Sequence, residues 1–248
     1  MNLVNVNNFG KENIDLLNER EDNRELTKGE RLLIDEINSF KPETILEYPC
    51  KNGRLLKELP SEGRGIYRGA DYRRRYIDTA KERFSDNKPY NPNAKFTFID
   101  VINNKNYRKE VDILVIRDHL QSELNPVEFL NRVQEKIKAK KIIVTIQYPK
   151  EHGQELGSNP KCFGLSNGSR FINFEYSEDA VRRIALDTGF DIILLEDEEG
   201  RFNSAVLLKE QVEVKPIVEE VKQEKIEKVV SKSPAKKKKK IIKSKKGE

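Results

Sequence analysis

The chain of 248 residues contains no tryptophan, one methionine, two cysteines and two histidines. Cys50 and Cys162 are too few for a disulfide framework, and with His119 and His152 they argue against a structural zinc site. No segment approaches the roughly 18 apolar residues of a membrane span, and residues 1–30 lack the apolar core of a secretory signal. These absences predict a cytoplasmic protein in a reducing compartment, with no membrane partner.

The charge of the chain is unevenly distributed. Residues 231–248 contain nine lysines and one acid, so residues 1–230 are mildly acidic although the whole chain carries +5. The run Lys236–Lys240 repels itself and cannot build a core, which predicts a disordered, Lys-rich tail over 210–248. We expect residues 231–248 to bind nucleic acid or another acidic partner by counterion release. In a eukaryotic host the run would suit a nuclear localisation signal, and a tail that only solubilises the protein is the alternative.

Helix and strand signals alternate along the remaining chain. Helices are predicted over 11–25, 28–40, 52–59, 73–84, from Asn125-Pro126 onward, and over 177–187. Strands are predicted over 43–48, 65–70, 95–99, 111–116, 141–146, 190–195 and 203–208. The short connection 196–201 makes the last two strands a hairpin, so the final strand should run antiparallel to its neighbour. The pattern predicts an α/β domain over 42–209, mostly parallel with a closing antiparallel hairpin, after an N-terminal helical extension over 1–41.

Residues 45–56 carry the most informative pattern. An apolar strand ends in the acid Glu47, a tight turn follows to Gly53, and an amphipathic helix begins there. Such a turn lets the backbone approach a nucleotide-like ligand, and the helix start offers free N–H groups. The next predicted strand ends at Asp71, about 20 residues on, where a ribose hydroxyl is often bound.

These segments resemble the class I S-adenosylmethionine-dependent methyltransferases. A variant of that family's first turn reads Leu-Asp-x-Pro-Cys-Gly-x-Gly-Arg, and this chain reads Leu46-Glu-Tyr-Pro-Cys-Lys-Asn-Gly-Arg54. Lys51 therefore replaces the middle glycine. The resemblance extends over about 29–209 and includes the late helix-to-strand phrase 180–190. It implies a Rossmann-like fold and S-adenosylmethionine as the cofactor.

The resemblance also implies roles for individual residues. Glu47 and the turn would face the methionine part of the cofactor, Asp71 would accept hydrogen bonds from the ribose, and Asp100 would flank the adenine. Each acid has a structural alternative, because strand-end acids also cap the helix that follows. The implied cofactor contacts are Glu47, Pro49, Cys50, Gly53, Asp71, Asp100 and Val101.

Three further segments have two readings each. Asp118 and His119 follow a predicted strand at the ligand-binding edge and are weak catalytic candidates, with His119 either a general base or a half-buried packing side chain. The polar segment 147–175 suits a mobile loop beside an acceptor site or a tolerated insertion. The basic and aromatic segment 67–76 suits nucleic-acid contact, although a solvated helix face is the commoner explanation.

Methyl transfer is the function that the resemblance implies, with a nucleic acid or an associated protein favoured as acceptor because of the tail. The alternative is a methyltransferase-like subunit without catalysis, which Lys51 favours. A nucleotide-binding oxidoreductase is disfavoured because the Gly-x-Gly-x-x-Gly pattern is absent.

Overall fold

The computed structural model of the chain describes residues 24–59, 65–84, 93–159, 161–164, 170–198 and 200–210. The predicted tail beyond residue 210 and nearly all of the predicted helix 11–25 lie outside these residues. The elements are α2 (Lys28–Phe40), β1 (Thr44–Glu47), α3 (Arg54–Glu58), β2 (Ile66–Asp71), α4 (Arg74–Arg83), β3 (Lys95–Phe98), β4 (Lys109–Arg117), the 3-10 turn η2 (Leu120–Ser122), α5 (Pro126–Lys136), β5 (Ile137–Pro149), β6 (Lys161–Gly164), β7 (Arg170–Asn173), α6 (Glu178–Thr188), β8 (Asp191–Leu195) and β9 (Phe202–Glu210).

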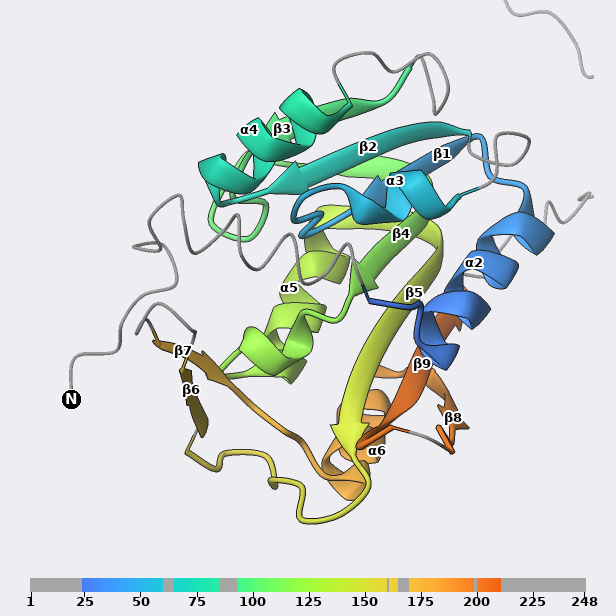
Figure 1. Cartoon of the computed structure of the whole chain (residues 1–248). Coiled ribbons are helices and arrows are strands. Elements are labelled where there is room, and N and C mark those ends of the chain that lie inside the picture. The colour runs from blue at the N-terminus through green and yellow to red at the C-terminus, as the bar shows by residue number, and fades with distance from the viewer. Residues whose placement is uncertain are drawn as a thin grey trace, which may run out of the picture. The chain divides into compact units, whose positions relative to one another are not determined.

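Seven strands form one sheet in the order β3-β2-β1-β4-β5-β9-β8 (Figure 1). The first five of these strands pair in parallel. β9 lies between β5 and β8 and runs antiparallel to both. The predicted class, a mostly parallel α/β sheet with a closing antiparallel hairpin, is therefore confirmed.

Helices cover both faces of the sheet. Leu33 of α2, Leu56 of α3 and Ile77 of α4 belong to one buried apolar cluster. Leu130 of α5 and Ile184 of α6 belong to the other cluster, on the opposite face. β4 and β5 contribute to both clusters, which is why their sequences are apolar over long runs. None of the described helices has the length and apolarity needed to cross a bilayer.

Local sequence signals set several helix ends. The Thr27 hydroxyl accepts a hydrogen bond from the Glu30 N–H at 3.2 Å, and the Glu30 carboxylate accepts one from the Thr27 N–H at 3.0 Å. These two hydrogen bonds form a capping box at the start of α2. α5 begins as predicted, with Asn125 as its cap and Pro126 in its first turn. α6 ends at Gly189, whose φ of 70° is the left-handed conformation that glycine accepts readily.

Two parts of the sequence interpretation need correction around β5. The strand is 13 residues long and starts directly after α5, earlier than predicted. Its first residues alternate between buried and exposed, with Ile137 and Ala139 inward, and this alternation was the missed strand signal. The segment 147–175, read as a loop, contains the end of β5 and the antiparallel pair β6–β7. Four-residue strands are too short to show a clear period in sequence.

We expect the core of the sheet to be sensitive to side-chain truncation. Ile143 is fully buried in the centre of β5, so Ile143→Ala should lower the free energy of unfolding by about 2–5 kcal/mol. Leu186 in α6 is 72% exposed and provides the matched control, for which the change should stay within about 0.5 kcal/mol. Urea unfolding of both variants tests this; equal losses would contradict the described packing.

Candidate functional site

The turn after β1 is fixed to both neighbouring strands. The Tyr48 N–H donates to the carbonyl of Val115 in β4, and the Cys50 N–H donates to that of Ala70 in β2, each at 2.9 Å. Gly53 has a φ of 76°, and a Cβ there would lie 2.7 Å from the Phe96 ring. Glycine at this position is therefore required by the backbone and by the packing against Phe96.

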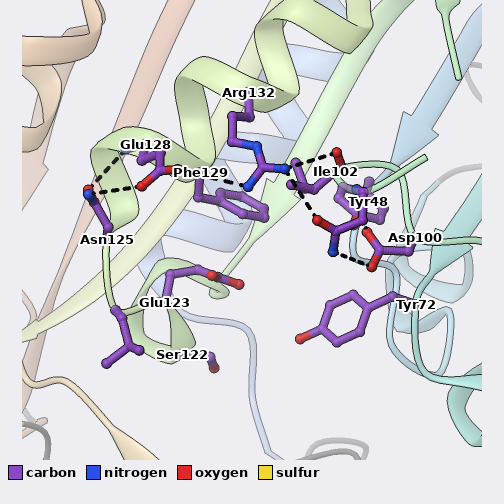
Figure 2. A pocket seen from close by; sticks show the side chains of 12 residues that line it. Tyr48, Tyr72, Asp100, Ile102, Ser122, Glu123, Asn125, Glu128, Phe129 and Arg132 are labelled. Carbon is purple, nitrogen blue, oxygen red and sulfur yellow. Dashed lines mark hydrogen bonds and ion pairs between the residues drawn. The ribbon is translucent and has the colours of Figure 1, made fainter. Parts of the chain in front are cut away.

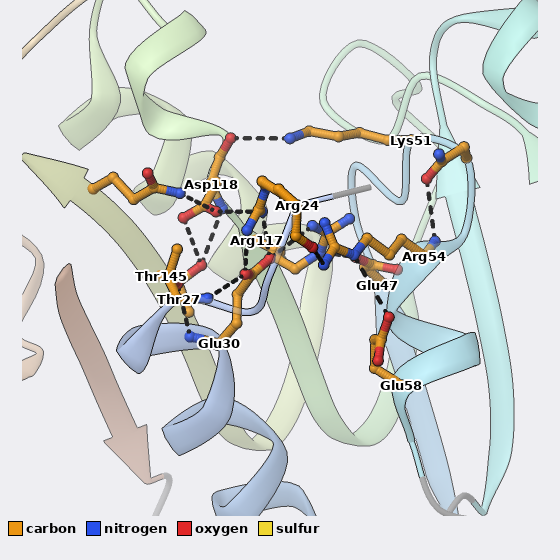
Figure 3. A network of polar contacts seen from close by, with 12 residues as sticks. Arg24, Thr27, Glu30, Glu47, Lys51, Arg54, Glu58, Arg117, Asp118 and Thr145 are labelled. Atoms are coloured by element: carbon orange, nitrogen blue, oxygen red, sulfur yellow. Dashed lines mark hydrogen bonds and ion pairs between the residues drawn. The ribbon is translucent and has the colours of Figure 1, made fainter. Parts of the chain in front are cut away.

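Lys51 occupies the place of the family's middle glycine with a φ of 51°, in the left-handed region. Its N–H donates to the Asp71 carboxylate at 3.0 Å. Its ammonium donates to the backbone carbonyl of Asp118 at 3.3 Å, so the side chain crosses from the turn to the end of β4 (Figure 3). Lys51 therefore has a backbone conformation that glycine usually adopts, and its side chain forms a polar bridge between the ends of β1 and β4.

Asp71 is fully buried at the end of β2. Besides the Lys51 N–H, its carboxylate accepts hydrogen bonds from the Arg73 N–H at 2.8 Å and from the Arg73 guanidinium at 3.0 and 3.2 Å. Burial disfavours the charged guanidinium, but Asp71 outweighs this and raises the pKa of Arg73. Four donors fill the acceptor capacity of a carboxylate, so a ribose hydroxyl would have to replace one of them.

Glu47 is also fully buried and paired. It accepts hydrogen bonds from the Tyr67 hydroxyl and from the Arg117 Nε, the latter at 3.2 Å. Burial and the charge of Glu47 raise the pKa of Tyr67, which keeps the phenol protonated as the donor. The Arg117 Nη1 in turn donates to Glu30 of α2 at 3.0 Å.

Residues just before α2 complete this polar network (Figure 3). The Arg24 guanidinium makes two hydrogen bonds of 2.6 Å to Glu30 and lies 3.6 Å from the Asp118 carboxylate. The Arg54 guanidinium donates to the Arg24 carbonyl at 2.8 Å. The Asp118 carboxylate also accepts hydrogen bonds from Thr145 and Gln147. The segment around Arg24 therefore reaches the carboxyl ends of β4 and β5.

His119 lies in the interior of the protein rather than at its surface. Its Nε2 lies 2.6 Å from the Glu123 carboxylate, and its ring packs at 5.2 Å from that of Phe129. Burial lowers the pKa of His119 although Glu123 acts in the opposite direction. Its Nδ1 has no hydrogen-bond partner among the described residues. His119 therefore packs inside the protein beside Phe129, and its lowered pKa favours the neutral imidazole.

A cavity of about 410 Å³ opens at the carboxyl edge of the sheet (Figure 2). Tyr48, Tyr72 and Asp100 line it from the ends of β1, β2 and β3, and Glu123 and Phe129 line it from the region after β4. Asp100 accepts hydrogen bonds from the Asn103 N–H and side-chain amide at 2.9 and 2.7 Å.

The sequence predictions selected only part of this cavity. Asp100 was predicted as a site residue, whereas its neighbour Val101 is buried in the core. Tyr48, Tyr72 and Glu123 were missed as site residues. The available signal was the position of each tyrosine, one residue after the strand-end acids Glu47 and Asp71. Pro49 and Cys50 belong to the β1 turn and do not line the cavity, and burial raises the pKa of the Cys50 thiol.

Among the described residues, no group of three or more His, Cys, Asp or Glu side chains could hold a metal ion.

Comparison with known proteins identifies the fold. No family model matches the sequence, and no curated protein matches it. A putative S-adenosylmethionine-dependent methyltransferase from Listeria monocytogenes is 14% identical, with a TM-score of 0.54 over 74% of this chain and 98% of that one. A SAM-dependent methyltransferase from Aquifex aeolicus is 17% identical, with a TM-score of 0.53 over 81% and 97%. The N-terminal domain of EvdMO1, crystallised in the presence of SAH and D-fucose, is 13% identical, with a TM-score of 0.54 over 75% and 84%. The chain therefore has the class I methyltransferase fold.

The polar network predicts how stability depends on pH. Burial alone would raise the pKa of Glu30, but Arg24 and Arg117 lower it from 4.5 to about 2. A carboxyl whose pKa is lowered on folding stabilises the protein above its unfolded pKa, and this contribution is lost as pH falls through the folded pKa. We expect Glu30 to contribute about 3 kcal/mol at pH 7 and to lose it between about pH 5 and pH 2.

Urea unfolding at several pH values measures this contribution. Glu30→Gln should be less stable than the native chain at pH 7, and the difference should shrink as pH falls to 3. Glu25, whose side chain is 95% exposed, supplies the matched Glu25→Gln control, which should follow the native curve. Parallel pH curves for Glu30→Gln and the native chain would contradict the role of Glu30.

Proposed function

We propose that this protein binds S-adenosylmethionine at the carboxyl edge of its sheet and catalyses methyl transfer. The observation that carries the proposal is the cavity at the ends of β1, β2, β3 and β4, within a sheet of methyltransferase order. Ligands of open α/β sheets bind at this edge. The SAH named with EvdMO1, a structure of the same fold, supports the choice of cofactor.

The cavity lining suits the adenosyl end of the cofactor. Tyr48, Tyr72 and Phe129 provide aromatic surfaces, and Asp100 and Glu123 provide acceptors for an amino group. Its volume of about 410 Å³ falls within the range of ligand pockets. When bound, S-adenosylmethionine supplies an activated methyl group, so the task of the protein is to bind it and to orient the acceptor.

The methionine end has a different environment. Glu47 and Asp71 already accept hydrogen bonds from Arg117 and Arg73, and Lys51 bridges to Asp118. These pairs specifically favour a second candidate function, a binding or structural subunit with a methyltransferase fold and no catalysis. In the catalytic proposal, the Lys51 ammonium leaves the Asp118 carbonyl when the cofactor binds.

For the acceptor we propose a nucleic acid or a nucleic-acid-associated protein, in the cytoplasm. The nine lysines of residues 231–248 support this choice, because concentrated positive charge attracts phosphate backbones.

Titration of the full chain with S-adenosylhomocysteine separates the two candidate functions. Calorimetry should show saturable binding, and ligand at about 100 times its dissociation constant should stabilise the fold by about 2.7 kcal/mol. The absence of heat and of any thermal shift at millimolar ligand would favour the non-catalytic subunit.

Lys51 provides a sharper test of the site. Lys51→Gly removes the bridge to Asp118 and places glycine where φ is positive, so the backbone is retained. We expect the variant to bind S-adenosylhomocysteine about tenfold more tightly, equivalent to about 1.4 kcal/mol for a hydrogen bond that no longer has to break.

Lys51→Met is the matched variant, because it keeps the bulk of the side chain and removes the ammonium. If the hydrogen bond to Asp118 opposes the ligand, Lys51→Met should gain as much affinity for S-adenosylhomocysteine as Lys51→Gly. If the size of the side chain opposes the ligand, only Lys51→Gly should gain affinity. Unchanged or weaker binding by Lys51→Gly would show that the bridge does not oppose the ligand.

A further inference from the structure

A concentration of positive charge lies on the folded domain itself, in residues that do not belong to the Lys-rich tail. The connection between β3 and β4, residues 99–108, includes Lys105 and Arg108 and a single acid, Asp100, and β4 begins with Lys109. Lys105 and Arg108 are exposed. Residues 42–209 contain 28 lysines and arginines and 26 acids, a net charge of +2, so these cations stand out on a nearly neutral domain.

Neighbouring elements extend this excess. The Lys136 ammonium of α5 donates to the carbonyl of Asn104 at 3.0 Å, which brings it beside Lys105. Arg68 of β2 is the register partner of Lys95 in β3, so both side chains share one face of the sheet. Burial raises the pKa of Tyr107, and the charge of Arg68 acts in the opposite direction, so Arg68 lies near Tyr107.

We call Arg68, Lys95, Lys105, Arg108 and Lys136 the basic surface. None of these five side chains forms an ion pair with a carboxylate anywhere in the described part of the chain. Arg182 and Arg183 of α6, in contrast, are each paired with an acid one helical turn away. Unpaired cations that share one face are the electrostatic footprint of a polyanion-binding surface.

We propose that the basic surface binds the phosphate backbone of a nucleic acid. Charge complementarity supports this partner, because clustered Lys and Arg side chains release counterions from phosphates on contact.

The position of the surface also supports this choice. Ile102 and Asn103, within the same β3–β4 connection, line the cavity at the carboxyl edge of the sheet. A strand held by Lys105 and Arg108 would therefore run beside the mouth of that cavity. The inference does not require methyl transfer, so binding can be tested without any cofactor.

The experiment must separate the basic surface from the tail. We start from the full-length chain with all nine lysines of residues 231–248 replaced by glutamine, the tail-neutral chain. Fluorescence anisotropy measures its binding to a labelled 20-nucleotide single strand between 50 and 200 mM KCl. We expect binding that weakens steeply with salt.

Lys105→Gln/Arg108→Gln in the tail-neutral chain should then weaken binding about tenfold or more at 50 mM KCl. The slope of log affinity against log salt should become shallower by about 1.4, since each phosphate contact contributes about 0.7. Among the described residues, Arg108 donates only to the neighbouring Tyr107 carbonyl, so the substitutions should leave thermal stability unchanged.

Lys57→Gln/Lys81→Gln is the matched control. It removes the same charge from exposed positions of α3 and α4, which pack on the opposite face of the sheet, and it should leave the affinity unchanged. Equal losses of affinity in both double variants would overturn the proposal. It would also be overturned if the tail-neutral chain showed no salt-dependent binding. Equal competition by poly-L-glutamate at matched charge would also overturn it and indicate an acidic protein partner.

Discussion

The buried guanidinium of Arg117 holds together the part of the structure on which the rest depends. It lies at the end of β4 and is bonded to Glu47 at the end of β1 and to Glu30 in the first turn of α2. One cation thereby connects two neighbouring strands and the helix that covers them. Burying two carboxylates and a guanidinium is costly, and the cost is offset only because the pairs are close and further hydrogen-bonded. Removing one partner would leave an uncompensated charge in the interior.

This network also determines what the carboxyl edge of the sheet can offer a ligand. In an open α/β sheet the ends of the central strands are the natural place for a bound molecule. Here the acids at the ends of β1 and β2 accept hydrogen bonds from arginine side chains of the same chain. The aromatic side chains one residue further on, Tyr48 and Tyr72, line the cavity instead. The carboxyl edge of the sheet thus has two parts: the acids Glu47 and Asp71, which are paired with arginines, and the cavity beside them, which is open to a ligand.

The sequence predicted the structure correctly where neighbouring residues determine the backbone conformation, as they do at helix ends. The capping box of Thr27 and Glu30, the Asn125-Pro126 start and the Gly189 end can be read from residue types because each satisfies a specific backbone requirement. The closing hairpin followed from a connection too short for a parallel crossover. The pairing of Glu47 with Arg117 was not predictable, since the two residues are 70 positions apart and are brought together only by strand order. The motif pointed to Glu47 and Asp71, whereas the cavity is lined by the residues that follow them.

The sheet order has a consequence for the behaviour of the protein in concentrated solution. β3 and β8 are the two edges of the sheet, and an edge strand offers unpaired N–H and C=O groups to other chains. Both edges are short, four residues in β3 and five in β8, and each begins with a charged residue, Lys95 or Asp191. The long, apolar strands β4 and β5 are enclosed between neighbours. The order of the strands therefore keeps the most aggregation-prone segments of this sequence away from intermolecular pairing.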